Sequence, residues 1–157
     1  MVVACEISVC VQLADFDVGQ QAQLLRSDAG VGAIVTFSGL VRDYHGDQRV
    51  DGLFLEHYPG MTENSLREIA AQAAARWPLS AIRIIHRIGE LRAGDQIVFV
   101  GVASAHRGAA FAGAEFVMDY LKTQAPFWKK SLQGNGAQWV DAKDSDATAA
   151  ERWGDKQ

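Results

Sequence analysis

The order of apolar and polar residues predicts a chain in which strands and helices are mixed. Segments rich in β-branched residues indicate strands, and apolar residues spaced three and four positions apart indicate helices. The predicted strands cover residues 2–11, 32–41, 50–58, 81–88 and 96–105, with a short one near residues 139–140. The predicted helices cover residues 17–26, 62–77 and 108–123, and a last helix is capped by Ser145. Because these elements do not alternate regularly, we expect an α+β fold.

Turn signals separate these elements. A polar loop with a central glycine is predicted at residues 43–48, and a turn at residues 90–95. Thr62 is the predicted N-cap of the second helix, with Glu63 in its first turn. Pro126 excludes the α conformation at the residue before it, so the third helix cannot pass Gln124, and residues 125–130 are predicted as a loop.

The stretch from residue 98 to residue 130 carries the clearest chemistry. A buried strand there turns at residues 104–108 into a helix whose apolar stripe is Phe111, Ala114, Met118 and Leu121. His106 and Arg107 therefore stand at a helix N-terminus, where unpaired backbone N–H groups and the helix dipole favour an anion. Lys122 lies in the last turn, with Lys129 and Lys130 just beyond. The pattern predicts anion-binding groups at both ends of one helix.

Length and composition fit a single domain spanning residues 1–157. The 157 residues are 48% hydrophobic, which is ample for one core. The sequence has no apolar run of about 18 residues and no basic segment before an apolar one at its start, so we expect neither a membrane span nor a signal peptide. Cys5 and Cys10 lie an odd number of positions apart on a predicted strand, so they face opposite ways. We therefore expect no disulfide or metal pair between them, and a cytoplasmic location.

The distribution of charge narrows the class of ligand. The net charge of −4 argues against a general nucleic-acid binder. Residues 106–143 hold five basic and three acidic residues, a local charge of +2 that leaves −6 for the remainder. A basic cluster in an acidic chain indicates a small anionic ligand. The four histidines share no metal-ligand spacing, and Ser104 near His106 lacks the glycine pattern of a nucleophile elbow.

Each candidate cation also has an ordinary structural explanation. Lys122 complements the dipole of its own helix, and Arg42 at a strand end is a rim charge. Lys129 and Lys130 fit a surface loop with extended lysines. Periodicity alone does not choose between these explanations and a binding site.

Five motifs give the chain a family resemblance. They are EHYPGM at residues 56–61, HRIGEL at 86–91, SAHR at 104–107, MDYLK at 118–122 and APFWK at 125–129. In these motifs the chain resembles the large, catalytic subunit of molybdopterin synthase, from about residue 30 to residue 153. The resemblance implies an α/β hammerhead-like fold with an additional antiparallel β subdomain.

The resemblance also implies a reaction and its partners. The family inserts two sulfurs into a cyclic pyranopterin monophosphate and so forms the dithiolene of molybdopterin, with no cofactor of its own. The sulfur arrives as a thiocarboxylate on the C-terminal glycine of a small ubiquitin-like subunit. A homodimer of large subunits carries one small subunit at each end, which makes a heterotetramer. No nucleic acid and no membrane are involved.

The resemblance assigns roles to individual residues. Lys122 and Lys129 are the catalytic pair, and neighbouring cations would lower the pKa of either lysine into the range of general acid–base catalysis. The expected substrate-binding residues are Phe37, Leu40, Val41, Arg42, His106, Arg107, Met118, Lys130, Ser131 and Lys143. Two of these depart from the pattern. At Leu40 we expect a basic residue, and at Lys143 an arginine, whose planar fork a lysine lacks.

Helix geometry adds an expectation about assembly. From Gly108 to Lys122 the predicted helix rises about 21 Å, at ~1.5 Å per residue. If His106 and Arg107 serve the same ligand as Lys122, the simplest arrangement is a two-fold dimer with shared sites. The competing hypothesis is a non-catalytic module that binds a protein tail or a phosphorylated metabolite. A phosphoesterase would need a metal cluster or an activated nucleophile, and the sequence indicates neither.

Overall fold

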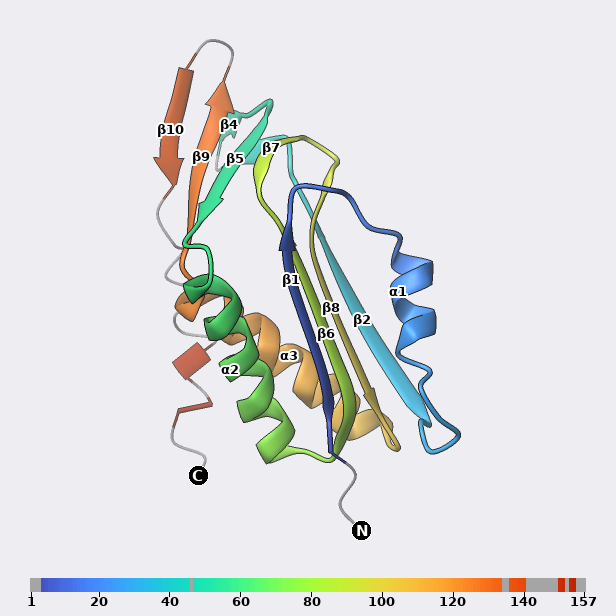
Figure 1. Cartoon of the computed structure of the whole chain (residues 1–157). Helices are drawn as coiled ribbons and strands as arrows, with labels where there is room; N and C mark the ends of the chain where they lie inside the picture. Colours follow the sequence, from blue (N-terminus) through green and yellow to red (C-terminus); the bar gives the residue numbers. More distant parts are fainter. Residues whose placement is uncertain (1–3, 46, 134–135, 141–149, 152, 155–157) are drawn as a thin grey trace.

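A four-stranded sheet forms the centre of the computed structural model, which describes residues 4–45, 47–133, 136–140, 150–151 and 153–154. Its strand order is β1 (Glu6–Gln12), β6 (Leu79–Arg87), β8 (Gln96–Ser104) and β2 (Ala33–Leu40), and only the β1–β6 pair is parallel. Helices α2 (Met61–Arg76) and α3 (Arg107–Gln124) cover one face, and α1 (Val18–Leu24) covers the other (Figure 1). The arrangement confirms the α+β prediction.

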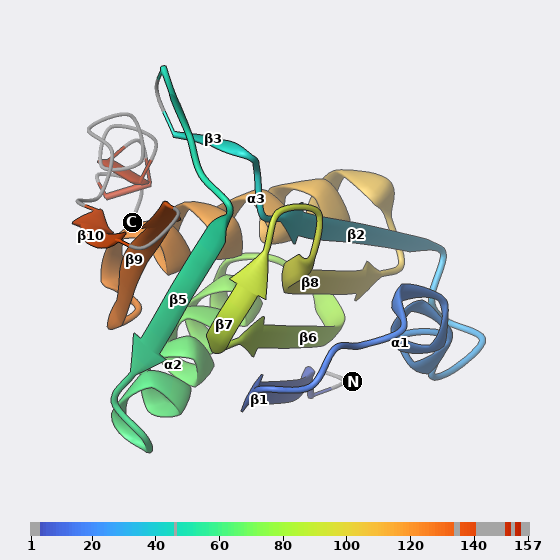
Figure 2. The same ribbon diagram turned by 90° about the horizontal axis from the view of Figure 1, so that it is seen from above.

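A second, antiparallel sheet extends beyond the ends of α2 and α3 (Figures 1 and 2). Its order is β10 (Gly136–Val140), β9 (Phe127–Gln133), β5 (Gly52–His57) and β7 (Gly89–Arg92). The short strands β3 (Tyr44–His45) and β4 (Gln48–Arg49) pair with each other beside it. This sheet matches the predicted additional β subdomain, and β10 confirms the short strand near residues 139–140.

The larger core lies between the main sheet and the two long helices. The buried face of α2 consists of Leu66, Ile69, Ala70 and Ala73, the three-and-four spacing that the sequence predicted. Strand β8 is buried along nearly its whole length because helices cover both of its faces. Within the described residues, no helix is both long and apolar enough to cross a membrane.

Two predicted irregular segments are strands. Residues 127–133 form β9, and residues 89–92 form β7. Both pair with β5, so the backbone groups that an isolated loop would expose to water are bonded within a sheet. The partner that the two segments share, β5, is distant from both in sequence, which local turn signals do not report; β9 also pairs with the neighbouring β10. The predicted polar loop at residues 43–48 likewise contains β3 and β4.

Two helix details also differ from the prediction. The N-cap of α2 is Gly60, with a φ of 85°, and its N–H donates to the Glu63 carboxylate; Thr62 is buried inside the first turn. On α3, Phe111 is 63% exposed, although the predicted apolar stripe included it. The buried face is instead Ala110, Gly113, Ala114, Phe116, Val117 and Leu121. The predicted helix capped by Ser145 lies outside the described residues.

Candidate active site

The two predicted catalytic lysines flank the corner where α3 passes into β9. The helix ends at Gln124 because Ala125, which precedes Pro126, is extended, with φ −76° and ψ 129°. Lys122 is in the last helical turn and is exposed, while Lys129 is the third residue of β9 and is half-buried. The proline therefore fixes where the helix stops and places both lysines on consecutive elements.

Side chains from two other elements hold this corner. The ring of His86, on β6, stacks on Phe127 with centroids 3.8 Å apart and ring planes at 20°. The Thr62 hydroxyl donates to the Pro126 carbonyl at 3.0 Å and accepts from the Tyr58 N–H at 3.0 Å. We call the segment 122–129 with these contacts the lysine corner.

Both lysines lie close enough to the buried ring of His86 for their charges to affect its pKa. Burial, together with the charges of Lys129, Lys122 and His57, lowers the pKa of His86 to about 3, against the opposing effect of its bond to the Arg87 carbonyl. The imidazole is therefore neutral at ordinary pH. Since a carbonyl only accepts, the Nδ1 atom, 2.8 Å from the Arg87 oxygen, carries the proton.

Strand β9 presents its polar residues to opposite faces. Lys129 pairs with Leu55 and Lys130 with Phe54, and the alternation of a strand turns adjacent side chains away from each other. Ser131 shares the face of Lys129 and is only 3% exposed, and within the described residues its hydroxyl has no hydrogen-bond partner. Of the two predicted neighbours, Ser131 thus lies on the face of Lys129 and Lys130 on the opposite face.

The end of β2 presents the next group of predicted residues. Arg42 and Leu40 are exposed, whereas the Val41 side chain is buried and its backbone bonds Gly94 and Asp95. Phe37 lies two residues after Val35, which packs on the core beneath α3, so both face that helix. Met118 of α3 is half-buried against the same core.

His106 and Arg107 lie at the other end of the main sheet. The β2–β8 ladder joins Ala33 to Ser104 at one end and Leu40 to Gln96 at the other. The eight residues of β2 span seven steps between these ends, which is about 23 Å at ~3.3 Å per residue. Figure 2 shows α3 running from this end to β9. A single chain therefore keeps His106 and Arg107 apart from Arg42 and the lysine corner, as the helix geometry predicted.

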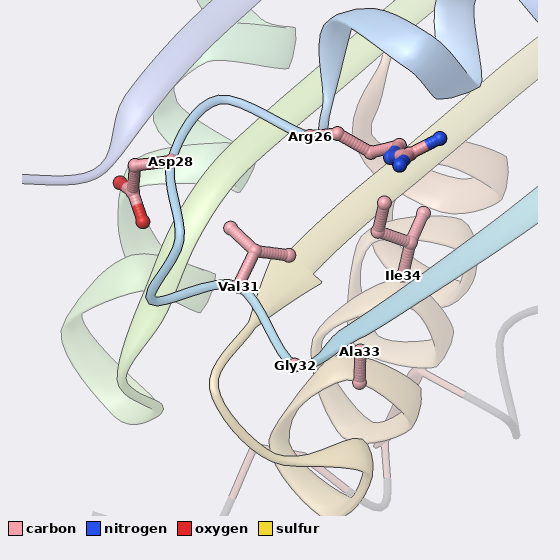
Figure 3. A pocket seen from close by; sticks show the side chains of 6 residues that line it. All are labelled: Arg26, Asp28, Val31, Gly32, Ala33 and Ile34. Atoms are coloured by element: carbon pink, nitrogen blue, oxygen red, sulfur yellow. The ribbon is translucent and has the colours of Figure 1, made fainter.

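His106 and Arg107 are both exposed. His106 is the N-cap of α3, and its side chain makes no capping hydrogen bond. A cavity of about 360 Å³ lies near this end, lined by Arg26, Asp28 and residues 31–34 (Figure 3). It is on the α1 side of the sheet and contains none of the predicted site residues. Lys143 lies outside the described residues, among which no cluster of three potential metal ligands occurs.

Comparison with known proteins assigns the family. A family model described as MoaE protein matches residues 11–124. The chain belongs to the MoaE protein family. It is 58% identical over 145 residues to a Vibrio cholerae protein named molybdopterin synthase catalytic subunit, covering 92% of this chain and 97% of that one.

Solved structures agree with the MoaE assignment. The MoaE protein from Burkholderia ambifaria superposes with a TM-score of 0.82 at 47% identity, covering 96% of this chain and 99% of the other. A molybdopterin synthase structure from Staphylococcus aureus gives 0.78 at 29% identity, covering 83% and 95%. These likenesses confirm the predicted family and fold class.

Three residues of the lysine corner in this MoaE protein were not predicted as parts of the site. His86 stood in the HRIGEL motif without a role, Thr62 was taken for a cap, and Phe127 was placed in a loop. The signal available for His86 was a histidine inside an apolar strand, which indicates a buried and therefore partnered ring. Nothing local indicates the contact of Phe127 with His86 or that of Thr62 with the Pro126 carbonyl, because these partners are distant in sequence.

Proposed function

We propose that this chain is the catalytic subunit of a molybdopterin synthase, a sulfurtransferase that moves two sulfurs from a thiocarboxylated small subunit to cyclic pyranopterin monophosphate. The lysine pair at the corner of α3 and β9 carries the proposal. A relative that shares 58% of its residues and 97% of its length with the chain, and that is named as this enzyme's catalytic subunit, supports it.

The lysine corner suits two anionic reactants. A thiocarboxylate tail and a cyclic phosphate are both negatively charged, and the ammonium groups of the two lysines attract them. The buried His86 beside the lysines is neutral and adds no charge of its own. Lys122 is exposed at the helix end and meets the incoming tail. Lys129 is half-buried and stabilises the charge that develops as the sulfur bonds to the pterin carbon. Either lysine can move a proton as the cyclic phosphate opens.

The remaining predicted residues would hold the pterin. Arg42 binds the phosphate, and Phe37 and Met118 contribute apolar surface on the α3 side of β2. The Val41 side chain is buried, so this residue acts through its backbone. Ser131 offers a buried hydroxyl on the face of Lys129. Lys130, Leu40 and Lys143 remain predicted contributors at the edges of the site.

We also propose that the site is shared between two copies of the chain. His106 and Arg107 of one copy would complete the site that contains Arg42, Lys122 and Lys129 of the other. Among the described residues β2 is an outer strand of its sheet, and its second edge has no strand paired to it there. Phe37 is 40% and Leu40 56% exposed on that strand, so each leaves apolar surface that a second copy could cover.

The proposed assembly is a homodimer of this chain with one small ubiquitin-like subunit at each end, in the cytoplasm. The word "subunit" in the name of the Vibrio cholerae relative supports a multisubunit enzyme. The small subunit's extended C-terminus would enter the lysine corner. Deleting its last two residues should therefore remove activity but only part of the affinity.

Reconstitution tests the proposal. The chain is incubated with a thiocarboxylated small subunit and the cyclic pterin, and the products are identified by mass spectrometry. We expect a pterin that has gained two sulfurs and a small subunit that has lost its thiocarboxylate. Binding of both reactants without this product would favour the non-catalytic binding module. Equal turnover with a truncated, sulfur-free small subunit would refute the sulfur-carrier role.

A further inference from the structure

His86 is a buried titratable residue that the chemistry above does not use. It lies on β6 of the main sheet, 4% exposed, and its ring stacks on Phe127, the first residue of β9. The stack joins the main sheet to the second sheet within the lysine corner, at the start of β9. A change at His86 would therefore reach the second sheet through Phe127.

Lys129 depends on this stack through the geometry of its strand. Phe127 and Lys129 lie on the same face of β9, whereas Trp128 between them turns to the other face and meets Tyr58, with ring centroids 4.1 Å apart. The two aromatic contacts thus fix β9 from both faces just before Lys129. Of the two, only the contact of Phe127 with His86 is on the face that carries the lysine.

His86 is itself held in one orientation. Its Nδ1–H donates to the Arg87 carbonyl at 2.8 Å, which fixes the tautomer and the plane of the ring. Desolvation keeps the ring uncharged, so it adds no repulsion to the two neighbouring ammonium groups. A flat, neutral and oriented ring is a suitable support for an aromatic partner.

We propose that His86 is a positioning residue of the sulfur-transfer site: its oriented ring holds Phe127 and thereby keeps Lys129 beside Lys122. The proposal rests on the proposed function, because it assigns Lys129 a task in turnover. It requires no contact between His86 and either reactant. Losing the ring should therefore slow turnover more than it weakens substrate binding.

Three substitutions separate the ring from its hydrogen bond. His86→Phe keeps a stacking ring without the Nδ1 donor, His86→Asn keeps a donor near that position without the ring, and His86→Leu keeps neither. Ile82→Ala is the matched control, because Ile82 is fully buried on the same face of β6 and away from the corner. The kcat and the KM for the pterin are measured in synthase reconstituted with thiocarboxylated small subunit, alongside the Tm of each variant.

We expect kcat to fall about 10- to 100-fold in His86→Asn and His86→Leu, the effect of a displaced catalytic group, with KM changed less than about twofold. His86→Phe should keep kcat within about threefold of the wild type, and Ile82→Ala should lower the Tm without lowering kcat. A His86→Phe enzyme as slow as His86→Leu would overturn the stacking role. Wild-type kcat in all three variants, or an equal loss of kcat in Ile82→Ala, would overturn it too.

A readout without turnover separates this proposal from the proposed function. The side-chain signals of ¹³C-labelled lysines are recorded by NMR for each variant in the absence of substrate. The Lys129 signal, assigned with Lys129→Ala, should move in His86→Leu and stay near its wild-type position in His86→Phe. If the wild-type protein makes no product, the proposed function fails, while the NMR result still decides whether His86 positions Lys129. An unmoved Lys129 signal in His86→Leu would overturn the positioning role.

Discussion

The two ends of helix α3 carry similar charges but are held very differently. At its C-terminal end, Pro126, Phe127 and Thr62 lock the lysine corner through a stacked ring and a hydroxyl that bonds two backbone groups. At its N-terminal end, His106 and Arg107 are exposed, and the His106 side chain makes no capping bond. Contacts within one chain thus hold the C-terminal end of α3 in place, whereas the side chains at its N-terminal end remain exposed. We call these the ordered end and the open end.

This difference indicates which end works within its own subunit. Catalytic groups must be held close to their productive geometry, and packing and hydrogen bonds restrain the lysine corner in this way. An exposed arginine at a helix start has no such restraint until another surface covers it. The comparison therefore predicts that the corner acts in its own subunit and that the open end acts in a second copy.

The largest effect should come from removing a lysine at the ordered end. Lys122→Ala should lower product formation by on the order of 10²–10³-fold or more, because a charge aimed at the developing anion is lost. Fold and small-subunit affinity should change little, since the side chain is exposed. Turnover and affinity are measured together, with Gln124→Ala, an exposed neighbour, as the control.

Lys129→Ala should impair turnover to a similar extent. Lys130→Ala should cost less, because Lys130 turns to the opposite face of β9. Near-normal turnover in Lys122→Ala would show that Lys122 has no part in the mechanism. The proposed difference in function between the two ends of α3 would then fail as well.

Mixing two inactive variants should restore activity if the open end serves a second copy. A His106→Ala/Arg107→Ala chain and a Lys122→Ala chain are combined under conditions where subunits exchange. Half of the dimers are then mixed, and each has one intact site, so about a quarter of wild-type activity should return. If labelled subunits exchange and no activity appears, each site lies within a single chain and the comparison fails.

The ordered end should also show in the pH dependence of stability. The pKa of His86 is lowered to about 3, so below its unfolded value near 6.5 the unfolded chain binds a proton that the folded chain refuses. The stability associated with the neutral ring is complete well above pH 6.5 and falls as the pH is lowered through that value. From well above pH 6.5 down to pH 5 the loss is about 2 kcal/mol, with a slope that reaches ~1.4 kcal/mol per pH unit.

Urea unfolding of wild type and His86→Phe at both pH values isolates this proton, since all other titrating groups are shared. The variant should lack the loss of about 2 kcal/mol that one proton accounts for. If the free energies of unfolding of wild type and His86→Phe change with pH in parallel, His86 takes up its proton equally in the folded and unfolded chain. The conclusion that the ring is neutral in the folded chain would then be wrong.

Sequence reasoning was most successful where the pattern is local. The buried face of α2 follows from its own spacing, and the end of α3 at Gln124 follows from Pro126 alone. Residues 125–130 were predicted as a loop because Pro126 and two lysines are typical of a surface segment, and pairing with β5 and β10 makes residues 127–133 a strand. Its alternation then decides that Lys129 and Lys130 face apart, which the sequence prediction had not resolved.

The candidate site divides in the same way. Helix geometry alone predicted that His106–Arg107 and Lys122 lie far apart, and the β2–β8 register agrees. The supporting contacts could not be predicted, because the partner of His86 is Phe127 and the partner of Thr62 is the Pro126 carbonyl, each on another element. Motifs predict the residues that meet the ligand, whereas tertiary packing selects the residues that hold them in place.

The smallest effect concerns two glycines of α3 that differ only in their surroundings. A Cβ added at Gly108, in the open first turn, meets nothing within 4 Å, whereas one at Gly113 would lie 2.9 Å from Leu79 Cδ1. Gly108→Ala should therefore raise the free energy of unfolding by about 0.5 kcal/mol through helix propensity and a less flexible unfolded chain. Gly113→Ala should lower it by about 1 kcal/mol or more, because crowding outweighs the same gain.

Urea unfolding at several protein concentrations measures both glycine variants. The gain at Gly108 should not depend on concentration if the helix start only presents His106 and Arg107 to the second copy. A gain over wild type that shrinks or reverses as concentration rises would mean that the backbone itself packs against that copy. The N-terminal end of α3 would then be buried in the dimer, and it would be exposed only in the isolated chain.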